Sequence, residues 1–482
     1  MNALLALNII GVVLVFTSLF MLAPALVSYL YGSADLWAIL ASFAVTFVAG
    51  ELMFLATRRY WKEEIGHRDS FLVVTLGWIA MALAGALPFL ISGEIPSVTD
   101  AVFESMSGFT TTGSSILTDV EALSRGVLFW RSLTHWVGGL GIIVFFVAVL
   151  PMMGAGGNQL FRAEISQVLP DKLKPRIIDT AKTLWKIYIV LTALGVVLLR
   201  LGGMDIYDSF CHAFGAVGTG GFSTKNLSMG AYESSYIRYV TVFLMFAGGT
   251  SFALHYQALR GGIGRYARDG EFVFYFLVLS AATMLITASV YRTDYDSLAV
   301  SFREALFQVV SIATATGFAT ADFEKWPVFT QVVLLGLMFI GGMAGSTAGG
   351  MKQVRALLSF KQARREIHHI IHPHAVSSIR LGDRVLPKEL LGSVWGFIFL
   401  FLVAWTFATL GLAALGVDPV TAASTAISAM SNVGPALGEA GPAENFASIP
   451  AAGKWILTFC MLLGRLEVYT VLVLFMPHFW RK

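Results

Sequence analysis

The stretch S-G-F-T-T-T-G-S-S, from Ser107 to Ser115, places hydroxyl side chains and glycines between two apolar segments. Related stretches occur three more times, each with a glycine thirteen positions after the opening residue. The four copies are D-A-V-F-E-S-M-S-G-F-T-T-T-G, D-S-F-C-H-A-F-G-A-V-G-T-G-G, E-A-L-F-Q-V-V-S-I-A-T-A-T-G and T-A-A-S-T-A-I-S-A-M-S-N-V-G, at Asp100–Gly113, Asp208–Gly221, Glu304–Gly317 and Thr421–Gly434. Copies in one register indicate an internal repeat. Their opening Asp, Glu or Thr is expected to cap a short helix.

The composition indicates a polytopic membrane protein. The chain has 482 residues, 56% of them hydrophobic and 13% charged, with a mean hydropathy of +0.73. This excludes an ordinary soluble domain. The first apolar stretch, Asn8 to Tyr31, lacks a small-residue cleavage site and is interpreted as a retained helix. The two cysteines, Cys211 and Cys460, lie in apolar surroundings, which argues against a structural disulfide or a cysteine metal site.

Basic residues cluster in alternate loops, which the positive-inside rule assigns to the cytoplasm. The clusters contain Arg58, Arg59, Lys62 and Arg68; Arg162, Lys172, Lys174, Arg176 and Lys182; Arg260, Arg265 and Arg268; Arg355, Lys361, Arg364, Arg365, Arg380, Arg384 and Lys388; and Arg481 and Lys482. The intervening loops carry Glu94, Asp119, Glu121, Asp205, Glu233, Asp294, Asp296, Asp322, Glu324, Glu439 and Glu444. These outward carboxylates either concentrate cations at a pore mouth or are simply solvated.

Each repeated copy holds a helix too short to span a membrane, followed by a strand-like segment, and so reads as a re-entrant segment. Irregular backbone is tolerated at membrane depth only where protein buries it or it lines a water-filled cavity. Four extended segments around one axis can direct carbonyl oxygens inward, where they replace the hydration shell of a cation, as in potassium-channel filters. Glycine permits the backbone angles that this requires. The alternative is that the small residues mediate tight helix contacts.

The candidate filter residues are those at or just before each glycine. They are Thr110, Thr111, Thr112 and Gly113; Thr219, Gly220 and Gly221; Ala315, Thr316 and Gly317; and Asn432, Val433 and Gly434. The second copy has two adjacent glycines, so its register is open by one position. The Gly-Phe sequence shared with Gly317-Phe318 favours Gly221.

These residues resemble the Trk/Ktr/HKT superfamily of potassium transporters, and within it the bacterial TrkH type. The resemblance covers nearly the whole chain. It rests on F-T-T-T-G-S-S, V-G-T-G-G-F-S-T, A-T-A-T-G-F-A-T, S-N-V-G-P-A-L-G-E-A-G-P, G-G-M-A-G-S-T-A-G-G-M-K at Gly341–Lys352 and L-L-G-R-L-E-V-Y-T at Leu462–Thr470.

The resemblance implies an all-α protein of four fused helix–pore-helix–helix units with pseudo-fourfold symmetry around one pore. Two extra N-terminal helices would be Asn8–Tyr31 and Leu36–Arg58, giving about ten spanning helices. The expected divisions are residues 1–68 for the N-terminal pair and 69–158, 159–262, 263–375 and 376–482 for the units, the third with an intramembrane gating loop.

The resemblance also implies function and partners. It implies K⁺ uptake, with Rb⁺ accepted. In this superfamily a serine in place of the first filter glycine is associated with sodium transport, whereas this chain has glycine at all four aligned positions. The expected setting is a bacterial inner membrane, with both termini cytoplasmic. The expected assembly is a homodimer regulated by a TrkA-type cytoplasmic nucleotide-binding ring. No covalent cofactor, no metal beyond the permeating K⁺, no catalytic residues and no nucleic acid are expected.

The second helices of the units carry aligned pairs, Gly138-Gly139, Gly248-Gly249, Gly341-Gly342 and Gly464-Arg465. An arginine at membrane depth costs roughly 2.5–3.5 kcal/mol on insertion scales, which makes Arg465 a functional candidate. On the pore axis its charge would oppose cation passage, and the resemblance agrees with such a barrier. The alternative is a structural ion pair, with Glu467 or with a partner from another unit.

The glycine-rich stretch from Gly341 to Lys352 is unfavourable for a continuous helix, because each interior glycine costs about 1 kcal/mol relative to alanine. It is interpreted as a broken helix, and the resemblance implies a gate below the filter. The candidate gating residues are Gly345, Ser346, Thr347, Ala348, Gly349, Gly350 and Lys352. The alternative is a close helix crossing built from small residues.

Other signals are weaker. His368, His369, His372 and His374 lie together, but Pro373 interrupts the helix and no cysteine or suitably placed carboxylate completes a metal site. The chain has no Walker-type phosphate loop and no G-x-G-x-x-G after a strand. A K⁺ transporter coupled to H⁺ or Na⁺ would need an intramembrane carboxylate on the ion path, for which Glu51 and Glu467 are the candidates. A membrane enzyme is the remote alternative, since no catalytic cluster is evident.

Overall fold

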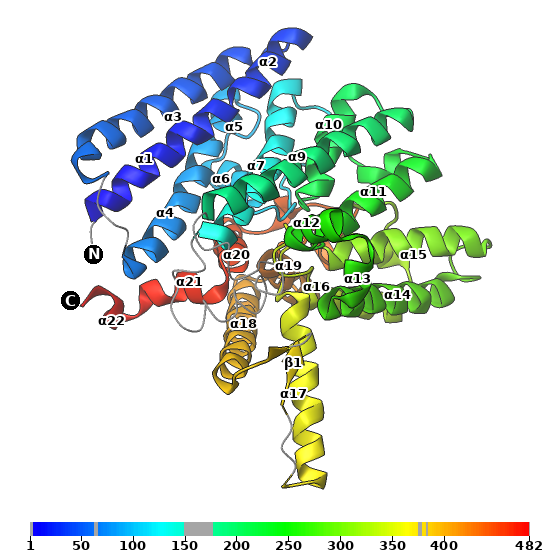
Figure 1. Ribbon diagram of the computed structural model, residues 1–482. Helices are drawn as coiled ribbons and strands as arrows, with labels where there is room; N and C mark the ends of the chain where they lie inside the picture. The colour runs from blue at the N-terminus through cyan, green and yellow to red at the C-terminus, as the bar shows by residue number, and fades with distance from the viewer. Residues whose placement is uncertain (1–2, 62–65, 149–176, 375–377, 382–383, 482) are drawn as a thin grey trace.

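The computed structural model describes residues 3–61, 66–148, 177–374, 378–381 and 384–481 (Figure 1). Side chains at positions 67, 142–148, 177–180, 384 and 388 are not described. Several basic residues used above to assign the cytoplasmic side, and the expected unit boundaries at 158/159 and 375/376, lie outside the described residues. These basic residues are Lys62, Arg162, Lys172, Lys174, Arg176 and Lys482.

Within the described residues the fold is helical, as predicted. The strands there form one short antiparallel pair, β1 (Arg380–Leu381) and β2 (Arg384–Val385). The strand-like segments expected after the short helices are extended, but they form no ladder in the described part of the chain. They are held by turns and side chains instead.

The N-terminal helices form a separate layer at one edge of the molecule (Figure 1). They are α1 (Ala3–Phe20), α2 (Leu22–Tyr31) and α3 (Leu36–Thr57), followed by the 3-10 turn η1 (Arg58–Tyr60). Glycines allow α1 and α3 to approach closely: a Cβ on Gly11 would lie 2.8 Å from the Gly50 carbonyl oxygen, and one on Gly50 equally close to the Gly11 oxygen. The amide of Asn8 donates to the Thr57 hydroxyl at 3.0 Å.

The rest of the chain repeats the expected order of helix, short helix and second helix four times. Unit 1 contains α4 (His67–Gly85), α5 (Leu87–Ser92), α6 (Val98–Phe109) and α7 (Arg125–Ala148). Unit 2 contains α9 (Ile177–Leu201), α10 (Ile206–Val217), η4 (Ser228–Ala231), α11 (Ser235–Gly248) and α12 (Phe252–Gly261). The expected boundary at 68/69 falls in the first turn of α4.

Units 3 and 4 follow the same plan. Unit 3 contains α13 (Gly264–Arg268), α14 (Gly270–Val290), α15 (Leu298–Ala313), η5 (Phe323–Lys325), α16 (Val328–Ile340) and α17 (Gln353–Ile371). Unit 4 contains α18 (Lys388–Ala414), α19 (Pro419–Ser431), η6 (Gly438–Ala440), η7 (Phe446–Ser448), α20 (Ala451–Arg465), α21 (Val468–Leu472), η8 (Val473–Phe475) and α22 (Pro477–Trp480).

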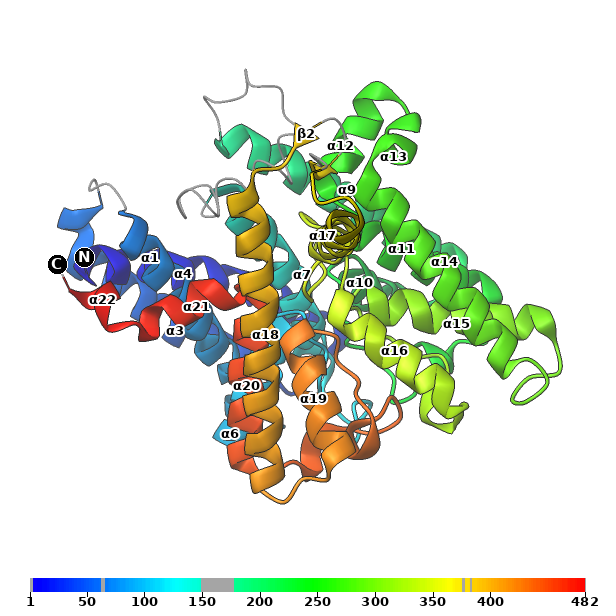
Figure 2. The same cartoon turned by 90° about the horizontal axis from the view of Figure 1, so that it is seen from below.

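The short helices α6, α10, α15 and α19 connect neighbouring units. Each packs against the second helix of the preceding unit: α10 against α7, α15 against α11, α19 against α16, and α6 against α20. Figure 2 shows α6 and α20 side by side, so the last unit meets the first. The four units therefore close into a ring, which is the predicted pseudo-fourfold arrangement.

The helices capable of crossing a membrane account for most of the expected spans. Within the described residues six helices are long and apolar enough, or eight if each of two bent pairs counts as one span. About ten spans were expected. The two that are missing from this count are the second helices of units 1 and 3, which are α7 and the 13-residue α16. The chain is thus a multi-pass membrane protein.

Three of the four second helices bend or end at the aligned pairs. The pair α11 and α12 is bent by 97° after Gly248, and the pair α20 and α21 by 115° after Arg465. In unit 3, α16 ends at Ile340 and α17 begins at Gln353, so the stretch between them interrupts the helix as predicted. In contrast, α7 continues through Gly138 and Gly139. Figure 1 shows α17 projecting away from the short helices.

The predicted capping residues of the short helices are wrong, by three positions in units 1, 2 and 4 and by seven positions in unit 3. The residues that precede the helices are Ser97, Asp205, Ser297 and Asp418. Three of them, all except Ser297, accept a hydrogen bond from a backbone N–H of the first turn. The predicted caps already lie inside the helices, so their side chains are available for other partners.

Candidate functional site

The four short helices end in the same turn. The residue two positions before each aligned glycine adopts the left-handed conformation, with φ of 53–54° at Thr111, Thr219, Ala315 and Asn432. The next backbone N–H then bonds back across the turn to a carbonyl of the short helix, at 2.8–2.9 Å. These bonds run from Thr112 to Ser107, Gly220 to Gly215, Thr316 to Ser311, and Val433 to Ser428. A left-handed non-glycine residue costs about 1–3 kcal/mol, so this turn is strained in all four units.

The aligned glycines are the next left-handed positions. Gly113, Gly221, Gly317 and Gly434 have φ of 87°, 80°, 82° and 105°. Gly220 is absent from the positive-φ glycines, so the register of the second copy is Gly221, as the Gly-Phe match indicated. Alternation between left-handed and extended residues lets successive carbonyl groups face one side of the segment.

The four glycines face one another in a closed ring. A Cβ on Gly113 would lie 2.1 Å from the Gly220 carbonyl oxygen. A Cβ added to Gly221 would lie 2.0 Å from the Thr316 oxygen, and one added to Gly317 would lie 2.1 Å from the Val433 oxygen. A Cβ added to Gly434 would lie 2.8 Å from the Thr112 oxygen of unit 1, which closes the ring. Each glycine thus abuts the carbonyl preceding the next glycine, in the order 1, 2, 3, 4, 1.

The candidate filter residues are buried except for Gly113, Gly221 and Gly317, which are partly exposed. Thr110, Thr111, Thr112, Thr219, Ala315, Thr316, Asn432 and Val433 have no exposed surface. In units 1 and 3, neighbouring threonine hydroxyls bond to each other, Thr110 to Thr112 and Thr314 to Thr316, both at 2.7 Å. The amide of Asn432 donates to the Thr112 hydroxyl at 2.9 Å, which ties unit 4 to unit 1.

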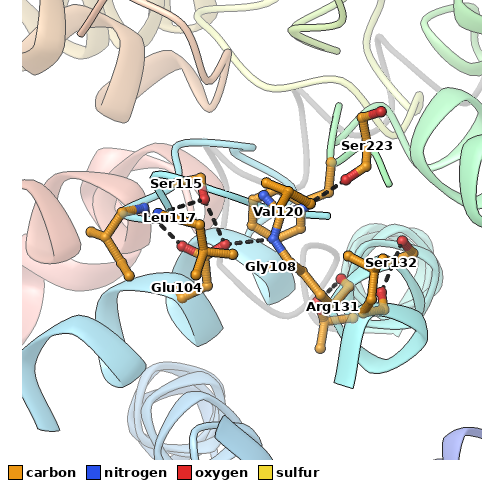
Figure 3. Close-up of polar contacts among 12 residues, drawn as sticks. Glu104, Gly108, Ser115, Leu117, Val120, Arg131, Ser132 and Ser223 are labelled. Atoms are coloured by element: carbon orange, nitrogen blue, oxygen red, sulfur yellow. Dashed lines mark hydrogen bonds and ion pairs between the residues drawn. The ribbon is translucent and has the colours of Figure 1, made fainter. Parts of the chain in front are cut away.

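Side chains of the short helices hold the segments beyond the glycines from behind. Asp208 accepts from the Thr224 hydroxyl at 2.7 Å, and Glu304 from the Thr320 hydroxyl at 2.6 Å. Each contact lies within one unit, and the two contacts involve equivalent positions in units 2 and 3. In unit 1, Glu104 accepts from Ser115 and binds Arg131 of α7 (Figure 3).

Basic residues of the second helices link neighbouring units. Arg238 of α11 pairs with Glu304 of unit 3 at 2.5 Å. Lys454 of α20 pairs with Asp100 of unit 1 at 2.7 Å, so Asp100 serves as an ion-pair partner rather than a cap. These pairs join each of the two short helices, α15 and α6, to the second helix of the preceding unit.

Below the ring, Arg465 is 2% exposed and contacts two other units. Its guanidinium donates to the Thr347 carbonyl at 2.7 Å and to the Gly138 carbonyl at 3.0 Å. These two oxygens are its hydrogen-bond acceptors in the described part of the chain. Glu467 pairs instead with Arg355 of α17 at 2.6 Å, so the alternative of an Arg465–Glu467 ion pair is not observed. The contacts to other units are with neutral carbonyls.

The interruption between α16 and α17 folds against the end of the second short helix. The Thr347 hydroxyl lies 2.9 Å from the Val217 oxygen and 3.0 Å from the Gly248 oxygen. The Met343 N–H donates to the Gly249 oxygen at 2.9 Å. A Cβ on Gly349 would lie 2.1 Å from the Ser431 oxygen. The loop therefore packs against the ends of two short helices at once.

The remaining loop residues fold the interruption onto itself. The ammonium of Lys352 donates to the Ala348 carbonyl, and the Ser346 hydroxyl to the Met343 carbonyl at 2.6 Å. Gly350 packs on Gly341, where an added Cβ would lie 2.7 Å from the Gly341 Cα. This compact form contains more contacts than a simple helix crossing requires.

The aligned glycines of the second helices lie where those helices cross the short ones. A Cβ on Gly138 would lie 1.9 Å from the Phe109 oxygen, and one on Gly464 would lie 1.9 Å from the Met430 oxygen. For Gly248 the corresponding distance to the Val217 oxygen is 2.8 Å. The three carbonyls occupy the same position in their units, four residues before the ring glycine. Close approach explains why these positions are glycine.

Some sequence signals lie away from this site, and some site residues gave no clear signal. The ring centroids of His368, on α17, and His372, just after it, lie 4.9 Å apart with the rings tilted by 50°. The described residues contain no group of three or more His, Cys, Asp or Glu that could hold a metal. Glu104, Arg131 and His135 contact the ring segments but are not among the site residues predicted from the sequence. Their presence as polar residues inside otherwise apolar segments was the available signal.

Comparisons with known proteins agree with this geometry. The TrkH family, described as a cation transport protein, matches residues 36–482. The Trk system potassium uptake protein TrkH of Salmonella typhimurium is 42% identical over 480 residues, covering 98% of this chain and 99% of that protein. The namesake protein of Halomonas elongata is 41% identical over 486 residues, covering all of both chains.

A solved structure has the same fold. The crystal structure of the potassium transporter TrkH from Vibrio parahaemolyticus superposes with a TM-score of 0.92 and 39% identity, over 100% of both chains. These matches confirm the predicted family, the all-α architecture and the prediction of a transporter rather than an enzyme. The chain belongs to the TrkH family of cation transport proteins.

Proposed function

We propose that this protein takes up potassium ions across a bacterial cytoplasmic membrane through the ring formed by Gly113, Gly221, Gly317 and Gly434. The observation that carries the proposal is the cyclic contact of each glycine with the carbonyl of the next unit. The names of the relatives, potassium uptake proteins, support K⁺ as the cargo.

The chemistry follows from backbone oxygens. Carbonyl groups of the four segments replace the water around a dehydrated alkali ion. The short helices point their C-terminal ends at the ring, and these ends carry the negative pole of the helix dipole, which favours a cation. The K⁺ ion is cargo held by the candidate filter residues, and no other metal or covalent cofactor takes part.

The gate in this proposal is the loop from Gly341 to Lys352, together with Arg465. The loop packs under the ring, and the Thr347 carbonyl receives the Arg465 guanidinium. A fixed positive charge beside the ion path opposes a passing cation, and displacement of the loop removes the contact that holds Arg465 in place. Loop opening thus lowers both a steric and an electrostatic barrier.

The orientation and the partners are also proposed. Loops rich in basic residues face the cytoplasm, with both termini on that side. The chain forms a homodimer gated by a TrkA-type nucleotide-binding ring, which the family resemblance supports. The basic and projecting helix α17 carries Lys361, Arg364 and Arg365 and offers a docking surface for such a ring.

The alternative is transport coupled to H⁺ or Na⁺ through an intramembrane carboxylate. Glu51 lies on α3, in the N-terminal layer rather than in a pore unit. Glu467 is paired with Arg355. Neither is among the residues of the ring, so uncoupled permeation is the better-supported mechanism.

The test is ⁸⁶Rb⁺ uptake into liposomes containing the purified protein, with K⁺ and Na⁺ as competitors and a pH-sensitive dye inside. K⁺ should compete far better than Na⁺, and Gly113→Ser should weaken that preference. Fixed proton movement per ion would instead establish coupling. Equal competition by K⁺ and Na⁺ in the unmodified protein would contradict the proposal.

A further inference from the structure

A buried ion pair lies behind the ring at the junction of units 1 and 2 (Figure 3). Arg131 Nε and Glu104 Oε1 are 2.6 Å apart, and their side chains are 3% and 0% exposed. Glu104 comes from the short helix α6, and Arg131 from α7 of the same unit. A buried pair of this kind is strongly perturbed when one partner is removed, because the other charge remains uncompensated.

The carboxylate side of the pair holds the first segment. Glu104 Oε1 accepts from the Ser115 hydroxyl at 2.9 Å, and Oε2 from the Ile116 N–H at 3.0 Å. The Ser115 hydroxyl also receives the Leu117 N–H at 3.2 Å. These contacts attach the residues just beyond Gly113 to the short helix.

The guanidinium side of the pair holds the second segment. Arg131 Nη1 donates to the Ser223 carbonyl at 3.0 Å, and its guanidinium carbon lies 3.6 Å from the centre of the Phe222 ring. One helical turn further along α7, His135 Nε2 accepts from the Phe222 N–H at 3.2 Å. Ser115 and Ser223 are equivalent, each two residues beyond its glycine, so the pair bridges matching points of adjacent segments.

The Glu104–Arg131 pair has no counterpart at the equivalent positions of the other units. The positions equivalent to Glu104, nine before each glycine, are occupied by His212, Gln308 and Thr425. The positions equivalent to Arg131, seven before the first residue of each aligned pair, are Thr241, Leu334 and Leu457. These six residues supply no carboxylate or guanidinium, so the charge pair sets the spacing of units 1 and 2 only.

We propose that Glu104 and Arg131 are positioning residues for ion selectivity. By joining Ser115 to Ser223 through one rigid pair, they set the separation of the first two segments and therefore the positions of their carbonyls toward the ion. The inference rests on the proposed filter function. The pair acts through geometry rather than through its field, because the two opposite charges lie 2.6 Å apart and largely cancel at the ion.

The experiment compares Glu104→Gln, Arg131→Met and the double variant, using ⁸⁶Rb⁺ uptake in liposomes and competition by K⁺ and Na⁺. Each single variant should lower the preference for K⁺ over Na⁺ by about tenfold. The double variant should be as unselective as the single variants, because it removes the uncompensated buried charge but does not restore the link between Ser115 and Ser223. Recovery of selectivity in the double variant would show that charge balance, not position, matters and would overturn the proposal.

Asp100→Asn is the matched control. Asp100 lies on the same short helix, and its charge pairs with Lys454 rather than contacting a ring segment. This variant should keep the K⁺ preference, and an equal loss in Asp100→Asn and Glu104→Gln would refute a specific role. If Glu104→Gln fails to fold, Arg131→Lys carries the test. Lysine keeps the charge but lacks the separate guanidinium nitrogens that contact Glu104 and the Ser223 carbonyl. This variant should therefore still lose selectivity, and unchanged selectivity would count against the proposal.

The outcome separates this inference from the proposed function. Loss of K⁺ preference in Gly113→Ser but not in Glu104→Gln or Arg131→Lys would remove only the positioning role. An unmodified protein without K⁺ preference would remove both.

Discussion

Alanine substitution at the four ring glycines should have graded effects that follow the geometry. Gly113, Gly221 and Gly317 would each place a Cβ within 2.0–2.1 Å of a neighbouring unit's carbonyl oxygen, whereas real Cβ contacts essentially never fall below 3.0 Å. That oxygen must therefore retreat by about 0.9–1.0 Å. At Gly434 the distance is 2.8 Å, so a retreat of about 0.2 Å suffices. All four also suffer about 1–3 kcal/mol of backbone strain.

The displaced oxygen is one that the proposal assigns to the ion, so the three severe variants should lose selective uptake. We expect their ⁸⁶Rb⁺ uptake, or its K⁺ preference over Na⁺, to fall by at least about tenfold, since each 1.4 kcal/mol is tenfold. Gly434→Ala should retain most of its selectivity. The assay is uptake into liposomes, normalised to folded protein by size-exclusion chromatography.

Gly416→Ala serves as the control for strain alone. Gly416 has φ of 88° at the end of α18, and nothing lies within 4 Å of an added Cβ. It should lower thermal stability while leaving selectivity unchanged. The reasoning fails if Gly434→Ala is as damaging as Gly113→Ala, or if Gly221→Ala or Gly317→Ala transports normally.

Three further outcomes are expected. Arg465→Ala should raise unitary flux by about tenfold, because a fixed positive charge beside the ion path raises the barrier by about 1–3 kcal/mol, and unchanged flux in planar-bilayer recordings would contradict the barrier. Thr347→Val removes the hydroxyl that contacts Val217 and Gly248, worth about 1 kcal/mol, so open probability should rise about fivefold in the same recordings. Burial, opposed by its bonds to Ser124, raises the pKa of Glu94 in the loop after α5. Glu94 therefore stabilises the fold less as the pH rises through that pKa, and Glu94→Gln should raise the melting temperature at neutral pH but not at acidic pH; a pH-independent difference would contradict this.

Much of the architecture was readable from local sequence. Helix lengths follow from runs of apolar residues, and the four copies follow from a repeated order of polar and small residues. The glycine register follows from the left-handed backbone that Gly113 and its equivalents must adopt. The interruption of the second helix in unit 3 was also indicated, because the glycines between Gly341 and Lys352 disfavour a continuous helix.

The strained turns gave no such signal. Thr111, Thr219 and Ala315 adopt left-handed backbone although their residue types disfavour it, and only Asn432 is a common choice there. The helix caps were misplaced for a related reason: Asp100 and Glu304 are good capping residues, but inter-unit partners, Lys454 and Arg238, use their charges instead.

The sequence alone therefore determined the repeat, the membrane-spanning class and the glycine positions, because each depends on residues close together in the chain. Only the tertiary structure decided that the units close in cyclic order, that Arg465 binds the Thr347 and Gly138 carbonyls, and that Glu104 and Arg131 bridge two segments. These contacts join elements from different units, and their partners include neutral backbone oxygens that every residue possesses. Packing of the ring selects among them, and no pattern along the chain records that choice.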